Sequence, residues 1–144
     1  MKRISTLATL AFAAFLAASL AVPSACAQGV VLRARVPFPF TVAETSMPAG
    51  NYLISSPSSG VIRIANADNN MAAAVTTTHD FQEPRGENKL IFNKYGEQYF
   101  LHTVICSETA QMNVDFATWK AEKSVRAREA AKLNRPETVM VAAK

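Results

Sequence analysis

Cysteine, histidine and glycine are scarce in this chain of 144 residues, which holds two, two and five of them respectively. No Gly-x-Gly occurs, so the standard glycine-rich loops that hold nucleotide phosphates are excluded. Gly-x-Ser-x-Gly and His-Glu-x-x-His are also absent, which excludes the common local motifs of serine hydrolases and zinc proteases. The sequence therefore predicts no cofactor.

The residues available for acid-base chemistry after residue 27 are few: His79, Asp80, Glu97 and His102. A zinc site needs three or four ligands, and the adjacent pair His79 and Asp80 has no further ligand beside it. Cys106 follows His102 at a separation of about 13 Å along an extended strand, too far for a catalytic dyad. We therefore predict no catalytic, cofactor-binding or metal residue. An enzyme whose site is assembled from these dispersed residues is the alternative.

The first 27 residues have the composition of a secretory signal peptide. Lys2 and Arg3 precede an apolar run over residues 7–22, which is shorter than the ~20 apolar residues that span a bilayer. Small residues at Ala25 and Ala27 then form a signal peptidase site. We expect cleavage after residue 27, and no transmembrane helix in the mature protein. The predicted location is outside the cytoplasm, periplasmic or extracellular.

The two cysteines have different expected fates. Cleavage after residue 27 removes Cys26, although lipid attachment at Cys26 is an alternative that would tether the mature chain. Cys106 then remains as a lone thiol, which cannot form a disulfide within the domain. Because it ends an apolar run, we expect it to be a buried core residue; a reactive surface thiol is the alternative.

Residues 28–116 are predicted to form a β-rich domain. Their length supports a single core and excludes a multidomain enzyme. Short runs rich in Val, Ile, Thr and aromatics alternate with Pro, Gly, Asn and Ser, which is typical of strands joined by tight turns. The fold class is mainly β, an antiparallel β-sandwich or flattened barrel with one C-terminal α-helix. The expected strands cover residues 30–36, 51–56, 61–66, 71–78, 89–95 and 98–106. The expected core residues are Tyr52, Ile62, Ile64, Phe92, Phe100 and Leu101.

Residues 117–144 are predicted to form a basic helical tail. The segment from Trp119 onward carries seven basic and three acidic residues, and no Gly or Pro occurs between residues 117 and 135. We expect a helix over residues 117–133, capped by Asp115 or Thr118 and half-docked by Trp119. A solvated helix face is the simpler interpretation of its charge, and adhesion to an anionic surface is the alternative. Residues 139–141 either add a strand or hang free.

Four segments carry a resemblance to known proteins: residues 36–42 (VPFPFTV), 47–52 (MPAGNY), 89–92 (KLIF) and 95–101 (YGEQYFL). In this order they resemble a family of small exported, functionally uncharacterised bacterial proteins with a signal peptide, a β-rich body and a charged C-terminal helix. The resemblance covers most of residues 30–135. It implies the fold and the export, and it transfers no catalytic residue. The chain departs from the pattern over residues 108–113, where a polar stretch replaces a glycine-containing turn.

These observations favour a non-enzymatic, exported domain that binds an envelope protein or a small ligand. Export argues against a nucleic-acid partner. The stretch around Phe38 and Phe40 is the first candidate for a binding edge, because Pro37 and Pro39 keep its backbone from full use in a ladder. The alternative is that both rings fold into the core.

Overall fold

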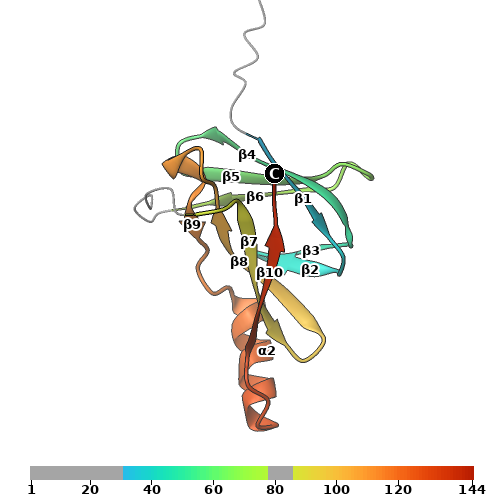
Figure 1. The fold of residues 1–144 in the computed structure, drawn as a ribbon. Coiled ribbons are helices and arrows are strands. Elements are labelled where there is room, and N and C mark those ends of the chain that lie inside the picture. Colours follow the sequence, from blue (N-terminus) through green and yellow to red (C-terminus); the bar gives the residue numbers. More distant parts are fainter. Residues whose placement is uncertain (1–30, 78–85) are drawn as a thin grey trace, which may run out of the picture.

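The computed structural model describes residues 31–77 and 86–144, which form two β-sheets and a helix (Figure 1). The predicted signal peptide with Cys26 lies outside the described residues, as do His79 and Asp80. The mainly β fold and its sandwich-like arrangement confirm the fold class that the sequence predicts.

The first sheet has four antiparallel strands in the order β1-β4-β5-β6. Along β1, buried residues alternate with exposed ones, as the period of a half-buried strand requires. The same alternation continues in the neighbouring strands, so one face of this sheet covers the core and the other meets solvent. The bounds of its strands are β1 Val31–Val36, β4 Gly50–Ser58, β5 Val61–Asn66 and β6 Ala72–Thr76.

The second sheet follows the order β10-β7-β8-β2-β3, with β9 paired to β8. Its neighbours are antiparallel except β2 and β8, which run parallel. Three of its strands are short, and the sequence pattern does not predict them as separate elements. The bounds are β2 Phe40–Val42, β3 Thr45–Met47, β7 Lys89–Tyr95, β8 Gln98–Ile105, β9 Val114–Asp115 and β10 Glu137–Ala142.

The chain passes between the sheets after β1 and again after β3, and its C-terminal residues also pair with the first sheet. The proline-flanked stretch between β1 and β2 carries the chain from the first sheet to the second. At the other end of the sequence, β10 pairs with β7 and the chain then continues onto β1. There the N–H of Arg33 donates to the carbonyl of Lys144 at 2.7 Å, and the N–H of Lys144 donates to the carbonyl of Arg33 at 2.8 Å. The final residues therefore close one side of the sandwich (Figure 1).

The core lies between the sheets, and all six core residues predicted from the sequence are buried. Phe92 lies near its centre, where its ring meets Phe38 and Phe40 edge to face, with centroids 5.3 and 5.2 Å apart. Cys106 is also buried, as expected. The other predicted core side chains are Tyr52, Ile62, Ile64, Phe100 and Leu101.

The helix α2, Lys120–Ala131, packs on the outside of the hairpin formed by β7 and β8. Val125 contacts Tyr95 and Phe100, so β8 is covered on both faces. The predicted caps at Asp115 and Thr118 are wrong: Trp119 precedes the first turn, and its side chain makes no capping hydrogen bond. The helix does not need a polar cap here, because tertiary packing holds it.

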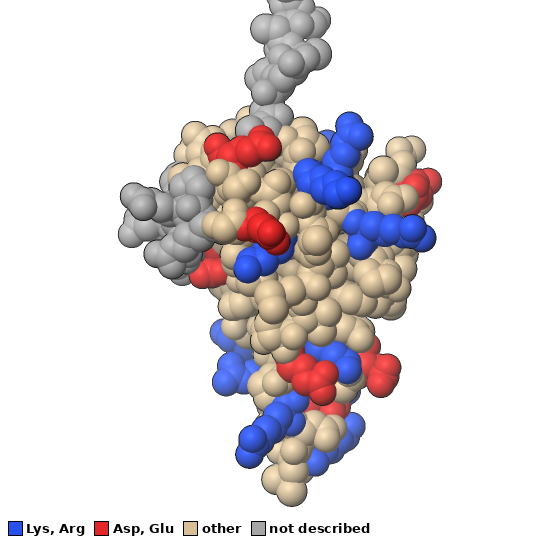
Figure 2. All heavy atoms as spheres, in the orientation of Figure 1, with Lys and Arg blue, Asp and Glu red and all other residues tan. Residues whose placement is uncertain are grey.

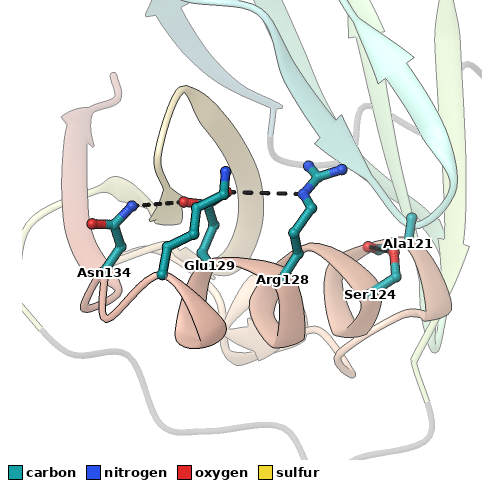
Figure 3. Close-up of polar contacts among 6 residues, drawn as sticks. Ala121, Ser124, Arg128, Glu129 and Asn134 are labelled. Carbon is teal, nitrogen blue, oxygen red and sulfur yellow. Dashed lines mark hydrogen bonds and ion pairs between the residues drawn. The ribbon is translucent and has the colours of Figure 1, made fainter.

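Both acidic side chains of α2 point toward the sheet. Glu122 is buried and accepts hydrogen bonds from the side-chain amide of Asn93 at 3.0 Å and the hydroxyl of Tyr95 at 3.1 Å. Burial and the nearby carboxylate of Glu122 raise the pKa of Tyr95. Glu129 accepts from Asn134 at 2.8 Å and lies beside Arg128 (Figure 3). Glu122 thus fixes the helix to the hairpin, and Glu129 ties the end of the helix to the residues that follow it.

Glu129 also packs against the turn between β7 and β8. Gly96 has a positive φ of 61° in this turn, and a Cβ there would lie 3.2 Å from a carboxylate oxygen of Glu129. Hydrogen bonds from Asn134 and Lys132 hold the pKa of Glu129 below its usual range. A depressed pKa stabilises the fold above the usual value of about 4.3, and this contribution is lost as the pH falls through the folded-state pKa.

We therefore expect Glu129→Gln to lower the free energy of unfolding at pH 7, by a difference that shrinks as the pH falls to 3. Urea unfolding at several pH values measures this difference. Glu44→Gln, which changes an exposed carboxylate between β2 and β3, is the control for a change in net charge. A Glu129→Gln difference that stays constant across this pH range would contradict the proposed linkage.

Candidate functional site

The acid-base residues that the structure describes do not come together. Glu97 is exposed in the turn between β7 and β8, and His102 lies in the middle of β8. Five residues of extended strand separate them by roughly 16 Å. The Nδ1 atom of His102 is buried without a hydrogen-bond partner, while its main-chain oxygen accepts from the N–H of Phe116. Within residues 31–77 and 86–144, no three His, Cys, Asp or Glu side chains form a metal-binding group.

The structure contradicts the candidate binding edge at Phe40, because this ring lies in the core. Phe40 is 3% exposed and packs edge to face on Tyr52, with ring centroids 5.0 Å apart. Phe38 stacks on Tyr99 at 3.9 Å between centroids. The core alternative is therefore confirmed for Phe40, whereas Phe38 is only partly buried where it packs against the core.

A pocket of about 500 Å³ opens on the outer side of the first sheet, over β1 and β4. We call it the β1 pocket. Its wall includes three basic residues, Arg33, Arg35 and Lys144, and the exposed amide residue Asn51. Its apolar wall includes Leu53, Ala67 and Ala142. The pocket therefore combines basic groups with apolar surface.

Strand alternation explains why the arginines line this pocket. Leu32, Ala34 and Val36 point into the core, so Arg33 and Arg35 must point to the outer face. Arg33 stands opposite Leu53 on β4, and Arg35 stands opposite Asn51. Side chains of paired residues share a face of the sheet, so these four side chains belong to one surface.

Lys144 belongs to the same surface because the chain after β10 pairs with β1. Its backbone exchanges two hydrogen bonds with Arg33, which places the two residues directly opposite each other. Ala142, two residues earlier, lies on the same side of the chain and forms part of the wall. Figure 2 shows basic side chains gathered on this face, near the region where β1 and the end of the chain lie in Figure 1.

One acidic residue, Asp68, lies near the pocket, in the turn after β5. It accepts hydrogen bonds from the backbone N–H of Asn51 at 3.0 Å and from the Asn51 side chain at 3.3 Å. These bonds, with a smaller contribution from Arg35, hold the pKa of Asp68 below its usual range. Asp68 is therefore a carboxylate whose main partner is Asn51. Salt bridges within 4.0 Å in the described part of the chain involve none of the three pocket cations.

The sequence pattern does not predict this pocket. Its available signal is the Arg-x-Arg pattern in the first strand, which places two cations on one face but by itself indicates only a solvated surface. Lys144 gives no local signal, because its position depends on a pairing with a residue more than a hundred positions earlier.

No family model, curated protein or solved structure matches this chain. Among the described residues, no helix has the length and apolar character needed to cross a membrane. The β1 pocket is the candidate functional site of the described residues.

Proposed function

We propose that the chain is an exported, non-enzymatic domain that binds a small ligand of the cell envelope in the β1 pocket. The export part depends on the features of residues 1–27, a basic start, an apolar run and a peptidase site. The protein then works in the periplasm or outside the cell. The binding part depends on the pocket.

The pocket carries this proposal because its size and lining suit a ligand. Small-molecule sites have volumes of roughly 300–1,000 Å³ and combine apolar walls with a few polar groups. The β1 pocket has about 500 Å³ and meets both conditions. In addition, β1 is hydrogen-bonded to β4 on one side and to Lys144 on the other. The backbone of the pocket is therefore ordered before a ligand binds.

A binding role agrees with the placement of the acid-base residues better than a catalytic one. Glu97 and His102 lie apart, and neither lines the β1 pocket. Catalysis by a general acid and base needs both groups within hydrogen-bond reach of one substrate. An enzyme assembled from dispersed residues is therefore the weaker interpretation, and alanine at His79 and His102 together should leave ligand binding intact.

Adhesion to an anionic surface through α2 is a second candidate function, which one observation favours. Glu122 and Glu129 face the sheet, so the exposed side of the helix keeps its basic residues without acidic ones between them. Lys120, Lys123 and Arg126 are all exposed there. Such a face attracts anionic lipid or polymer in a salt-dependent way.

A retention experiment on envelope extract tests the proposed function. Ala142 is exposed on the wall of the β1 pocket, so Ala142→Trp should fill the pocket without disturbing the core. We expect mass spectrometry to find small molecules retained by the wild-type protein and lost from Ala142→Trp. The matched control is Ala74→Trp, an exposed alanine on β6 that does not line the pocket.

Equal retention by both tryptophan variants would contradict binding in the pocket. The variant Lys120→Gln/Lys123→Gln separates the second candidate function from the first. If retention is lost only in this helix variant, the binding surface is α2 and the pocket proposal is wrong.

A further inference from the structure

We propose that the β1 pocket selects a small organic anion, in which an oxyanion group is attached to an apolar body. This inference rests on the proposed function, since it names the class of ligand for the same pocket. The cations bind the negatively charged group of the ligand, and the apolar wall contacts its hydrocarbon part.

The three cations lie on one face of the sheet, close enough for their side chains to reach one head group. Arg33 and Arg35 are two residues apart on β1, so their Cα atoms are separated by about 6.6 Å on the same face. Lys144 flanks Arg33 on the next strand, about 5 Å away in the ladder. Arginine side chains can cover these separations, and each guanidinium can bind a carboxylate, phosphate or sulfate with two parallel hydrogen bonds.

These cations are available to a ligand. In the part of the chain that the structure describes, the ion pairs within 4.0 Å lie on α2 and between Lys94 and Glu137, away from the pocket. Asp68, the carboxylate beside the pocket, is engaged by Asn51. An anion entering the pocket therefore meets three positive side chains and would not have to displace an existing salt bridge.

The apolar wall distinguishes this ligand from an inorganic ion. Leu53 is 36% exposed and stands directly across the ladder from Arg33. Ala67 and Ala142 extend the same wall, and small side chains at these positions leave room for a ligand. Covering this wall with hydrocarbon removes apolar surface from water, which stabilises the complex. A bare anion gains nothing from it.

The recessed shape favours a single small molecule over a membrane surface. A membrane-binding face needs apolar side chains that protrude into the lipid. Here the apolar wall consists of Leu53 and two alanines, which line the pocket together with the cations. The ligand is therefore a free molecule with a volume below that of the pocket.

Calorimetric titration with three probes tests the inference. Decanoate, below its micelle concentration, carries both proposed features, decanol lacks the charge, and inorganic phosphate lacks the apolar body. For the wild-type protein we expect decanoate to bind at least about tenfold more tightly than either other probe, because only decanoate combines charge-assisted hydrogen bonds with burial of the apolar wall. Added salt should weaken decanoate binding.

Arg33→Gln/Arg35→Gln should weaken decanoate binding about tenfold or more and leave decanol binding unchanged. The control is Arg63→Gln/Arg135→Gln, which removes the same charge from exposed positions outside the pocket: Arg63 lies on the outer face of β5, and Arg135 lies between α2 and β10. We expect this control to bind decanoate within twofold of wild type.

The outcomes separate this inference from the proposed function. If decanol binds as tightly as decanoate, or phosphate does, the ligand class is wrong, while the pocket remains a binding site if Ala142→Trp blocks the probes. If none of the probes binds but Ala142→Trp still loses envelope material, the ligand class alone is wrong. If Arg33→Gln/Arg35→Gln binds decanoate like wild type, the assignment of the two arginines is overturned.

Discussion

Replacing Phe92 with alanine should lower the free energy of unfolding by about 3–5 kcal/mol, the usual cost of removing a large ring from a packed core. The side chain of Phe92 is 0% exposed, and it lies on β7 between the rings of Phe38 and Phe40. Its removal leaves a cavity and breaks two edge-to-face contacts, each worth about 0.5–1.5 kcal/mol beyond the buried area. Such a loss is a large part of the stability of a small domain.

Urea unfolding of the purified protein measures this loss. If Phe92→Ala does not fold, Phe92→Leu gives a smaller cavity and a smaller loss in the same direction. Met140→Ala is the control, because Met140 lies opposite Ile91 on the neighbouring strand β10 and is 64% exposed. We expect the control to change the free energy of unfolding by less than about 1 kcal/mol. If Phe92→Ala also lowered the free energy of unfolding by less than about 1 kcal/mol, this ring would not hold the sheets together.

The central strands could be predicted because their signal is local. The boundaries of β5 and β7 agree with the sequence pattern, and the burial of Ile62 and Ile64 follows from the alternation along β5. A strand with one buried face needs a period of two residues, and turn residues mark its ends. These features are read from a few consecutive residues without knowledge of the partner strand.

The short strands and the binding pocket could not be predicted in this way. β2 and β3 have three residues each, too few to show a period, and β2 pairs with a strand almost sixty residues away. The pocket depends on Lys144 meeting Arg33 across the sandwich. Such pairings are decided by how the two sheets pack, and no local pattern records them.

In the helix, the burial of a polar residue likewise could not be predicted from the sequence. Its position within residues 117–133 could be predicted from composition, but composition alone places Glu122 among the solvated charges. It is buried because Asn93 and Tyr95 on the hairpin supply hydrogen-bond donors. A buried carboxylate needs such partners. The sequence does not show that residues almost thirty positions earlier provide them.

The polar stretch over residues 108–113 has a similar explanation. It contains the short 3-10 helix Ala110–Met112, followed by the buried Asn113. The side chain of Asn113 accepts from the N–H of Cys106 at 2.7 Å and donates to the carbonyl of Cys106 at 3.0 Å. One amide thus replaces a backbone partner at the end of β8, so the loop can begin without a glycine turn.

Asn113→Ala should therefore lower the free energy of unfolding by about 2–4 kcal/mol. The substitution leaves the N–H and the carbonyl of Cys106 buried without partners, and each unsatisfied buried group costs about 1–3 kcal/mol. Cys106 is itself fully buried, so water cannot readily replace the lost bonds. Asn113→Asp keeps the size and the acceptor but removes the donor to the carbonyl, and it should also destabilise the protein.

Urea unfolding at constant pH measures these losses, and Asn88→Ala is the matched control. The side chain of Asn88 accepts from the N–H of Ser107 at 2.7 Å, one residue after Cys106, but this contact is exposed. Because water can take the place of Asn88, we expect Asn88→Ala to cost less than about 1 kcal/mol. Equal losses for the two alanine variants would show that the number of hydrogen bonds matters and burial does not. A loss for Asn113→Ala but none for Asn113→Asp would assign the effect to packing of the side chain and would contradict a stabilising role for its N–H donor.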